Sequence, residues 1–163
     1  MKTDKAQTSL RRQNSAREFK NNLERARFDS IKRRPNANNQ MSRLVINSDS
    51  SYKLITDINQ DGTLGTSDEK TITLSSGDGI KLLGTDMVYP VTIRFNWRGQ
   101  AEVLNANNVN ITPNFIICEN SCTAQTATNS NSNLISVSAG GTVTMTGGGD
   151  TLPTFNEIGR AHV

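Results

Sequence analysis

The chain changes character at Pro35. Residues 9–34 place apolar side chains mostly three, four or five positions apart among many lysines and arginines, which is typical of an amphipathic helix. After Pro35, short runs rich in branched residues alternate with asparagine, serine, threonine and glycine turns, as β-strands do. Proline disfavours helical backbone in the residue before it, so the helix should end here. The sequence therefore predicts an α+β fold: one basic helix, then a single β-rich domain.

Length and composition bound the size of that domain. Of the 163 residues, about 120 remain once the helix is set aside, enough for one modest sheet system. Hydrophobic residues make up 34% of the chain and aromatic residues 5%, so we expect a core of isoleucine, leucine and valine. Three segments are predicted: the helix at 1–37, a globular β domain at 38–156 and a non-native tail at 157–163. The tail resembles translated sequencing-adapter DNA and is set aside.

The β domain should be antiparallel, because its strand-like runs are short and numerous. Turns are predicted at 76–79 and 97–100 as hairpin breaks, and 123–133 reads as a polar loop. In 91–97, apolar and polar residues alternate as in a half-buried strand. The predicted strands are 41–47, 52–56, 70–74, 80–83, 91–97, 101–104, 114–118, 134–138 and 142–145.

Charge is divided unevenly along the chain. Residues 1–43 hold twelve lysines and arginines against four acids, a balance of +8, and the remaining residues hold six against eleven, a balance of −5. A basic helix stripe can bind phosphates, lipid head groups or an acidic neighbouring subunit. Acids interleaved with the cations fit a solvated helix face equally well. The candidate contact residues are Arg11, Arg12, Arg17, Lys20, Arg25, Arg27, Lys32, Arg33 and Arg34.

Cys118 and Cys122 are the only cysteines. Their spacing favours a disulfide across a short turn, which would indicate an oxidising compartment; a metal pair or two free thiols are the alternatives. With His162 the only histidine, the chain cannot build a four-ligand zinc site from sulfur and imidazole.

The sequence also lacks a plausible Ser/His or Cys/His pair and a phosphate-binding glycine loop, so we expect no enzymatic activity. No apolar run approaches the length needed to cross a bilayer.

Residues 57–68 carry a pattern typical of a calcium-binding loop. Oxygen-bearing side chains stand at positions one, three and five, glycine at six, a backbone carbonyl ligand at seven and a carboxylate at twelve. Position twelve is aspartate instead of glutamate, and no helix pattern flanks the loop. A plain Asn/Asp/Gly turn between two strands is therefore the alternative. The candidate calcium ligands are Asp57, Asn59, Asp61, Thr63 and Asp68.

Four short stretches follow one another in a specific order: residues 19–34, 54–69, 93–99 and 134–143. The first reads FKNNLERARFDSIKRR and the third IRFNWRG. In that order they resemble the LxxARxxAIxRN, FxDxNxNGxxDxGE, ITFxxxG and IxVSxxGxV motifs of the GspH/FimT-type minor pseudopilins and minor type IV pilins. The resemblance covers residues 10 to about 146.

The resemblance implies a pilin-like fold, with the helix packed on the antiparallel β domain, and a structural role in fibre assembly or at the fibre tip. Family members begin with a cleaved prepilin leader and an apolar helix that sits in the inner membrane and later in the fibre core. Neither is seen here, so we expect a truncated or replaced N-terminus and a soluble fragment. The full-length protein would occupy the bacterial inner membrane, the periplasm and a cell-surface fibre. Its partners would be other subunits of a type IV pilus or type II secretion pseudopilus.

Two other functions remain open from the sequence. Some family members implicated in DNA uptake carry arginines after the glycine near the last strand, where this chain has GGTVT at 140–144. A DNA-binding minor pilin would therefore have to rely on the helix cations alone. A calcium-stabilised adhesive module is the other alternative.

Overall fold

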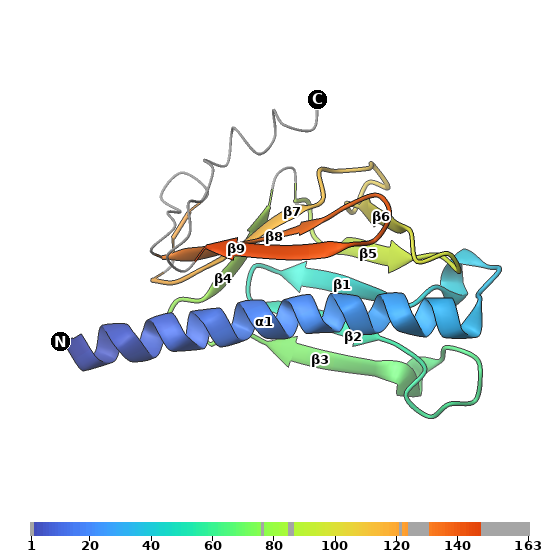
Figure 1. The fold of residues 1–163 in the computed structure, drawn as a ribbon, viewed down its shortest axis with the longest axis horizontal. Helices are drawn as coiled ribbons and strands as arrows, with labels where there is room; N and C mark the ends of the chain where they lie inside the picture. Colours follow the sequence, from blue (N-terminus) through green and yellow to red (C-terminus); the bar gives the residue numbers. More distant parts are fainter. Residues whose placement is uncertain (1, 76, 85–86, 121, 124–130, 148–163) are drawn as a thin grey trace.

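A computed structural model describes residues 2–75, 77–84, 87–120, 122–123 and 131–147, with no side chains described for 2–6. In this part of the chain, one long helix is followed by nine strands (Figure 1). Short 3-10 turns lie at Asn38–Gln40 and Thr66–Asp68. The elements are α1 (Lys2–Arg33), β1 (Arg43–Ser48), β2 (Ser51–Ile55), β3 (Glu69–Thr73), β4 (Lys81–Gly84), β5 (Val91–Phe95), β6 (Ala101–Leu104), β7 (Asn114–Cys118), β8 (Ser132–Val137) and β9 (Val143–Gly147).

The strands form two antiparallel sheets, ordered β3-β2-β1-β5-β6 and β4-β7-β8-β9. Each predicted strand matches one of them, with ends shifted by at most two residues, so the α+β prediction with antiparallel sheets is confirmed. The predicted turn at 97–100 is also confirmed, because the Asn96 N–H donates to the Gln100 carbonyl oxygen at 3.0 Å where β5 pairs with β6.

The hairpin predicted at 76–79 is wrong. Strand β3 pairs with β2, whereas β4 pairs with β7 in the other sheet, so the chain crosses between sheets here. Glycine and aspartate favour a tight turn of either kind, and local sequence does not say which strand will be the partner. Of the loop predicted at 123–133, residues 124–130 lie outside the described residues, and 132–133 belong to β8. The tail at 157–163 also lies outside them.

Helix α1 starts seven residues earlier than predicted. Residues 2–8 have no apolar stripe to signal a helix, but they contain no glycine or proline, and an existing helix extends easily through such residues. Its end at Arg33 is as expected: Arg34 adopts a left-handed φ of 52°, and its N–H donates to the Ser30 carbonyl oxygen at 2.8 Å just before Pro35. In Figure 1 the N-terminal turns of α1 extend past the strands.

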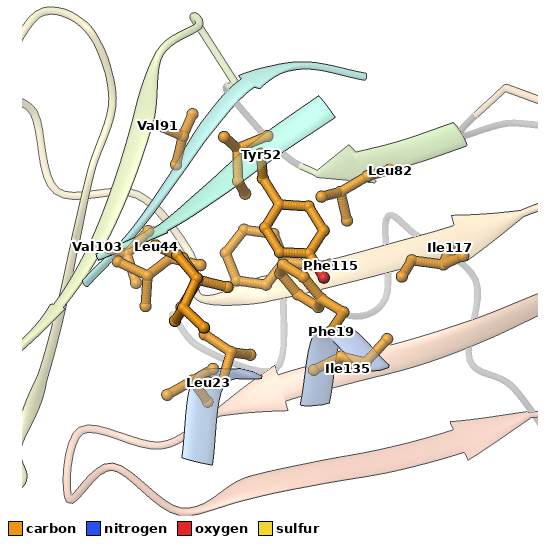
Figure 2. Close-up of a cluster of buried hydrophobic side chains, with 14 of the residues drawn as sticks. Phe19, Leu23, Leu44, Tyr52, Leu82, Val91, Val103, Phe115, Ile117 and Ile135 are labelled. Carbon is orange, nitrogen blue, oxygen red and sulfur yellow. The ribbon is translucent and has the colours of Figure 1, made fainter. Parts of the chain in front are cut away.

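The helix packs on both sheets at once through Ala16, Phe19, Leu23 and Ala26, each fully buried. The Phe19 ring meets the Tyr52 ring of β2 edge-on, with centroids 5.2 Å apart, and the Phe115 ring of β7, with centroids 5.7 Å apart (Figure 2). One helical side chain thus joins the two sheets.

Most core residues are aliphatic, as expected, but aromatic rings occupy its centre. Phe19, Tyr52, Phe95 and Phe115 are all fully buried. Phe19, Tyr52 and Phe115 meet where the helix contacts the two sheets, a placement that composition does not reveal. The predicted alternation holds through Phe95, after which β5 ends and leaves Trp97 47% exposed.

Candidate functional site

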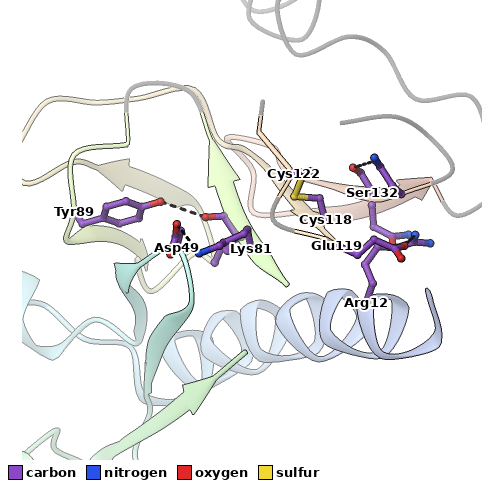
Figure 3. Close-up of a disulfide and its surroundings, with 11 residues drawn as sticks. Arg12, Asp49, Lys81, Tyr89, Cys118, Glu119, Cys122 and Ser132 are labelled. Atoms are coloured by element: carbon purple, nitrogen blue, oxygen red, sulfur yellow. Dashed lines mark hydrogen bonds and ion pairs between the residues drawn. A yellow bond between two sulfur atoms is a disulfide. The ribbon is translucent and has the colours of Figure 1, made fainter. Parts of the chain in front are cut away.

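Three of the helix cations predicted as contact residues face the body of the molecule. Arg12 is 1% exposed; its Nε donates to Asn133 Oδ1 at 3.0 Å and its Nη1 pairs with Glu119 (Figure 3). Arg33 Nη2 donates to the Gln40 carbonyl oxygen at 2.8 Å, and Arg27 Nε donates to the Gly99 carbonyl oxygen at 3.1 Å.

Arg12, Arg27 and Arg33 therefore have a role within the fold that the sequence did not predict, and their role as partner contacts stays a prediction. A guanidinium taken out of water needs such acceptors, and the sequence does not show which cations will be buried.

The other six cations lie toward solvent. Arg11 is largely exposed while its Nη1 pairs with Asp78 Oδ2 at 2.9 Å, and Lys20 pairs with Glu24 at 2.8 Å. The other four predicted contact cations have exposed side chains: Arg17, Arg25, Lys32 and Arg34.

Two shallow recesses run along the outer face of α1, of about 480 and 300 Å³, and both are lined by Asn21 and Arg25. The larger also contains Lys32 and Phe28, which is 63% exposed. The smaller contains Arg17 and Glu18, with Lys70 from β3. We call this strip the outer helix face; it combines positive charge with an exposed aromatic ring.

Residues from three of the four family-like stretches meet at one place on the opposite side of the helix. Arg27 comes from the first stretch, Gly99 from the third and Gly141 from the fourth. A Cβ atom on Gly141 would overlap the Gly99 carbonyl oxygen and come within 2.7 Å of Arg27 Nε. Gly99 and Gly141 also have φ values of 79° and 93°, a left-handed region that favours glycine. Two turns, one from each sheet, thus approach closely beneath the helix.

The predicted calcium loop collects three carboxylates. Asp57, Asp61 and Asp68 each offer an oxygen within 4.8 Å of the others, so this cluster could hold a metal ion. The other two predicted ligands bond within the loop: Asn59 Oδ1 accepts the Asp61 N–H at 3.3 Å, and Thr63 Oγ1 donates to Asp61 Oδ1 at 3.3 Å.

The same carboxylates close the turn by accepting backbone N–H groups. Asp68, 1% exposed, accepts from Ile58 at 2.9 Å and from Gly65 at 2.8 Å. Hydrogen bonds, first of all from the Thr63 N–H, lower the pKa of Asp61 below its usual range. The loop is thus consistent with both sequence interpretations, a metal site and a plain turn.

This loop is attached to the C-terminal end of α1. Asp29 accepts the Asp57 N–H at 3.1 Å, and it also pairs with Arg33 and accepts from Ser42 Oγ. Gln40 accepts the Leu64 N–H at 2.8 Å. A conformational change in the loop would therefore alter the contacts of Asp29 at the C-terminal end of α1.

Cys118 and Cys122 form a disulfide, with Cα atoms 6.0 Å apart, so the favoured interpretation holds over a metal pair or free thiols (Figure 3).

Sequence reasoning missed two acids near the disulfide, Glu119 and Asp78, which form ion pairs with arginines of the helix. Hydrogen bonds, first from Arg11 and then from Ser75, lower the pKa of Asp78. Neither acid belongs to a periodic pattern; the only available signal was the place of Glu119 between the cysteines.

Among the described residues, no helix combines the length and the apolar character needed to span a membrane. No family model, curated protein or solved structure matches the chain.

Proposed function

We propose that this chain is a structural subunit of the minor pilin or pseudopilin type, without enzymatic activity, that assembles into a type IV pilus or type II secretion pseudopilus. The observation that carries the proposal is the meeting of Arg27, Gly99 and Gly141. These residues come from three stretches that resemble the family, and they lie far apart in sequence. Together they join the helix to a turn of each sheet, which supports the view that the three stretches have their places in one fold.

The outer helix face supports the same proposal. It lies on a side of α1 that the body leaves uncovered, and it presents Arg17, Arg25, Phe28 and Lys32 to solvent. Charged rims around an aromatic anchor are common in protein interfaces. Other pilin or pseudopilin subunits with acidic surfaces are the proposed partners, and an apolar helix preceding this segment would supply the inner-membrane anchor.

The test is incorporation into a fibre. The leader and apolar half-helix of an established minor pilin are joined ahead of residue 8, and the chimera is expressed in a bacterium whose own copy of that subunit is deleted. We expect the chimera in the sheared fibre fraction, dependent on the assembly ATPase. An Arg25→Glu/Lys32→Glu variant at equal cellular level should be depleted from that fraction, and Lys53→Glu on strand β2 should not. A stable, processed chimera absent from the fibres would refute the proposal.

A DNA-binding minor pilin remains the alternative for the same surface. Glu18 and Glu24 lie in the recesses beside the cations and would repel phosphates, which favours a protein partner. Binding to duplex DNA that weakens steeply with salt, and that is lost in the Arg25→Glu/Lys32→Glu variant, would support the DNA function. Undetectable binding at low salt would eliminate it.

A calcium-stabilised module is a second candidate function, favoured by the convergence of Asp57, Asp61 and Asp68. Calcium that binds only the folded loop should raise the melting temperature in proportion to the logarithm of its concentration. Thermal unfolding is measured in calcium, in magnesium and in chelator, for the native chain and for Asp61→Asn. A calcium-specific rise that Asp61→Asn removes supports the site, and equal melting temperatures in calcium and chelator would leave only a plain turn.

A further inference from the structure

Two of the segments that attach helix α1 to the body differ in their chemistry. From Ala16 to Ala26 the attachment is mainly apolar and spans both sheets. On the N-terminal side of Ala16, the described contacts with the body are polar. We call this second attachment the polar clasp; it consists of Thr8, Ser9, Arg11 and Arg12 on the helix and Asp78, Glu119 and Asn133 on the body.

Arg12 and Glu119 form the buried ion pair of the polar clasp. The Arg12 side chain is 1% exposed and that of Glu119 is 7% exposed, so the two charges neutralise one another away from water. A buried guanidinium without its carboxylate is strongly disfavoured. If Glu119 moves, the favourable response is for this part of the helix to leave the body and for Arg12 to reach water.

The disulfide loop contains one acid of the polar clasp, Glu119, and contacts the other, Asp78. Glu119 directly follows Cys118, the last residue of β7, and its carbonyl oxygen accepts the Cys122 N–H at 3.2 Å. The next residue, Asn120, has a left-handed φ of 57° and donates its N–H to the Asp78 carbonyl oxygen at 2.9 Å. Closing the ring between the cysteines restricts this loop, because the cross-link removes most of its alternative conformations.

We infer that the Cys118–Cys122 disulfide is a redox-sensitive latch for the N-terminal part of α1. In the oxidised chain, the latch presents Glu119 and Asp78 to the polar clasp and keeps residues 8–12 on the body. In the reduced chain, that segment is released while Ala16–Ala26 stays packed. The inference does not depend on the proposed fibre function.

The chemistry is thiol–disulfide exchange with a dithiol. A dithiol thiolate attacks one sulfur, most accessibly that of Cys122, which is half-buried, whereas Cys118 is fully buried. A mixed disulfide forms and the Cys118 thiolate leaves. The second thiol of the reductant then displaces Cys122, so two electrons pass to the protein, both cysteines become thiols and the reductant becomes a disulfide.

Hydrogen exchange read by mass spectrometry tests the latch on the whole chain, oxidised and after reduction with dithiothreitol. We expect amides in residues 8–14 to exchange about tenfold faster or more after reduction, with residues 16–26 unchanged. Glu119→Gln in the oxidised chain should release the same segment without any change in the disulfide. Lys53→Gln, which breaks an exposed ion pair with Glu69, is the matched control and should change neither segment.

Three outcomes would overturn the inference. Equal exchange of residues 8–14 in both redox states would show that the loop holds its position without the disulfide. A parallel rise in residues 8–14 and 16–26 would show that the disulfide stabilises the whole fold and latches nothing. Unchanged exchange in oxidised Glu119→Gln would show that the buried ion pair does not hold the segment. Reoxidation should restore slow exchange, which separates release from irreversible unfolding.

Discussion

Replacing Gly141 with alanine should destabilise this protein severely. A side chain at its φ of 93° costs about 1–2 kcal/mol in backbone strain. The new Cβ would overlap the Gly99 carbonyl oxygen and lie 2.7 Å from Arg27 Nε, so the two turns would have to separate. Separation breaks the hydrogen bond from Arg27 to Gly99, which as a charged bond contributes about 1.5–3 kcal/mol. We therefore expect a loss of about 2.5–5 kcal/mol from a total of about 5–15 kcal/mol for a typical domain.

Urea unfolding followed by Trp97 fluorescence measures this loss, because Trp97 is the only tryptophan and lies in the turn that would move. Gly140→Ala is the matched control one residue away. There a Cβ would meet only Ser138 Oγ, at 3.8 Å, with no left-handed backbone, so its effect should stay within about 0.5 kcal/mol. If Gly141→Ala costs less than about 1 kcal/mol, or no more than Gly140→Ala, the close approach of the two turns does not exist as described.

Phe19→Ala should cost about 3–5 kcal/mol in urea unfolding, because that ring joins both sheets, whereas Phe28→Ala on the exposed helix face should cost less than about 1 kcal/mol; equal losses would contradict the described core. Burial raises the pKa of Tyr89 to about 12 and that of Tyr52 above its ordinary value. Because both pKa values are raised on folding, their stabilising effect is complete below about pH 10 and is lost as pH rises further; a flat unfolding free energy between pH 9 and pH 12 would contradict this. Asn114 is buried with neither amide atom hydrogen-bonded, so Asn114→Leu should be neutral or stabilise by up to about 1 kcal/mol, and a clear loss in urea unfolding would reveal an unrecognised partner.

Local sequence patterns predicted most of the secondary structure. The end of α1 before Pro35 follows from the fixed geometry of proline, and the strands follow from short branched runs between turn residues. The disulfide was the interpretation that the spacing favoured, and Cys118 and Cys122 have no other cysteine to pair with. Each of these features depends on residues that are close together in the chain.

The acidic loop was predictable only in part. Its ligand pattern is local, and Asp57, Asp61 and Asp68 do converge. The attachment of the loop to Asp29 was not predictable, because that residue lies on the helix and appeared there as one of several interleaved acids. A linear pattern identifies the ligands of a site but not the parts of the fold that the site is connected to.

Tertiary structure alone decided the division into two sheets, the choice of buried cations and the polar clasp. Arg12 and Arg17 look alike in the sequence, yet Arg12 is buried against Glu119 and Arg17 is exposed. Gly99 and Gly141 look like ordinary turn glycines until the two turns are brought together. Secondary structure follows from interactions a few residues apart, whereas burial, pairing of charges and close backbone contacts depend on which distant segments meet, and that depends on the packing of the whole chain.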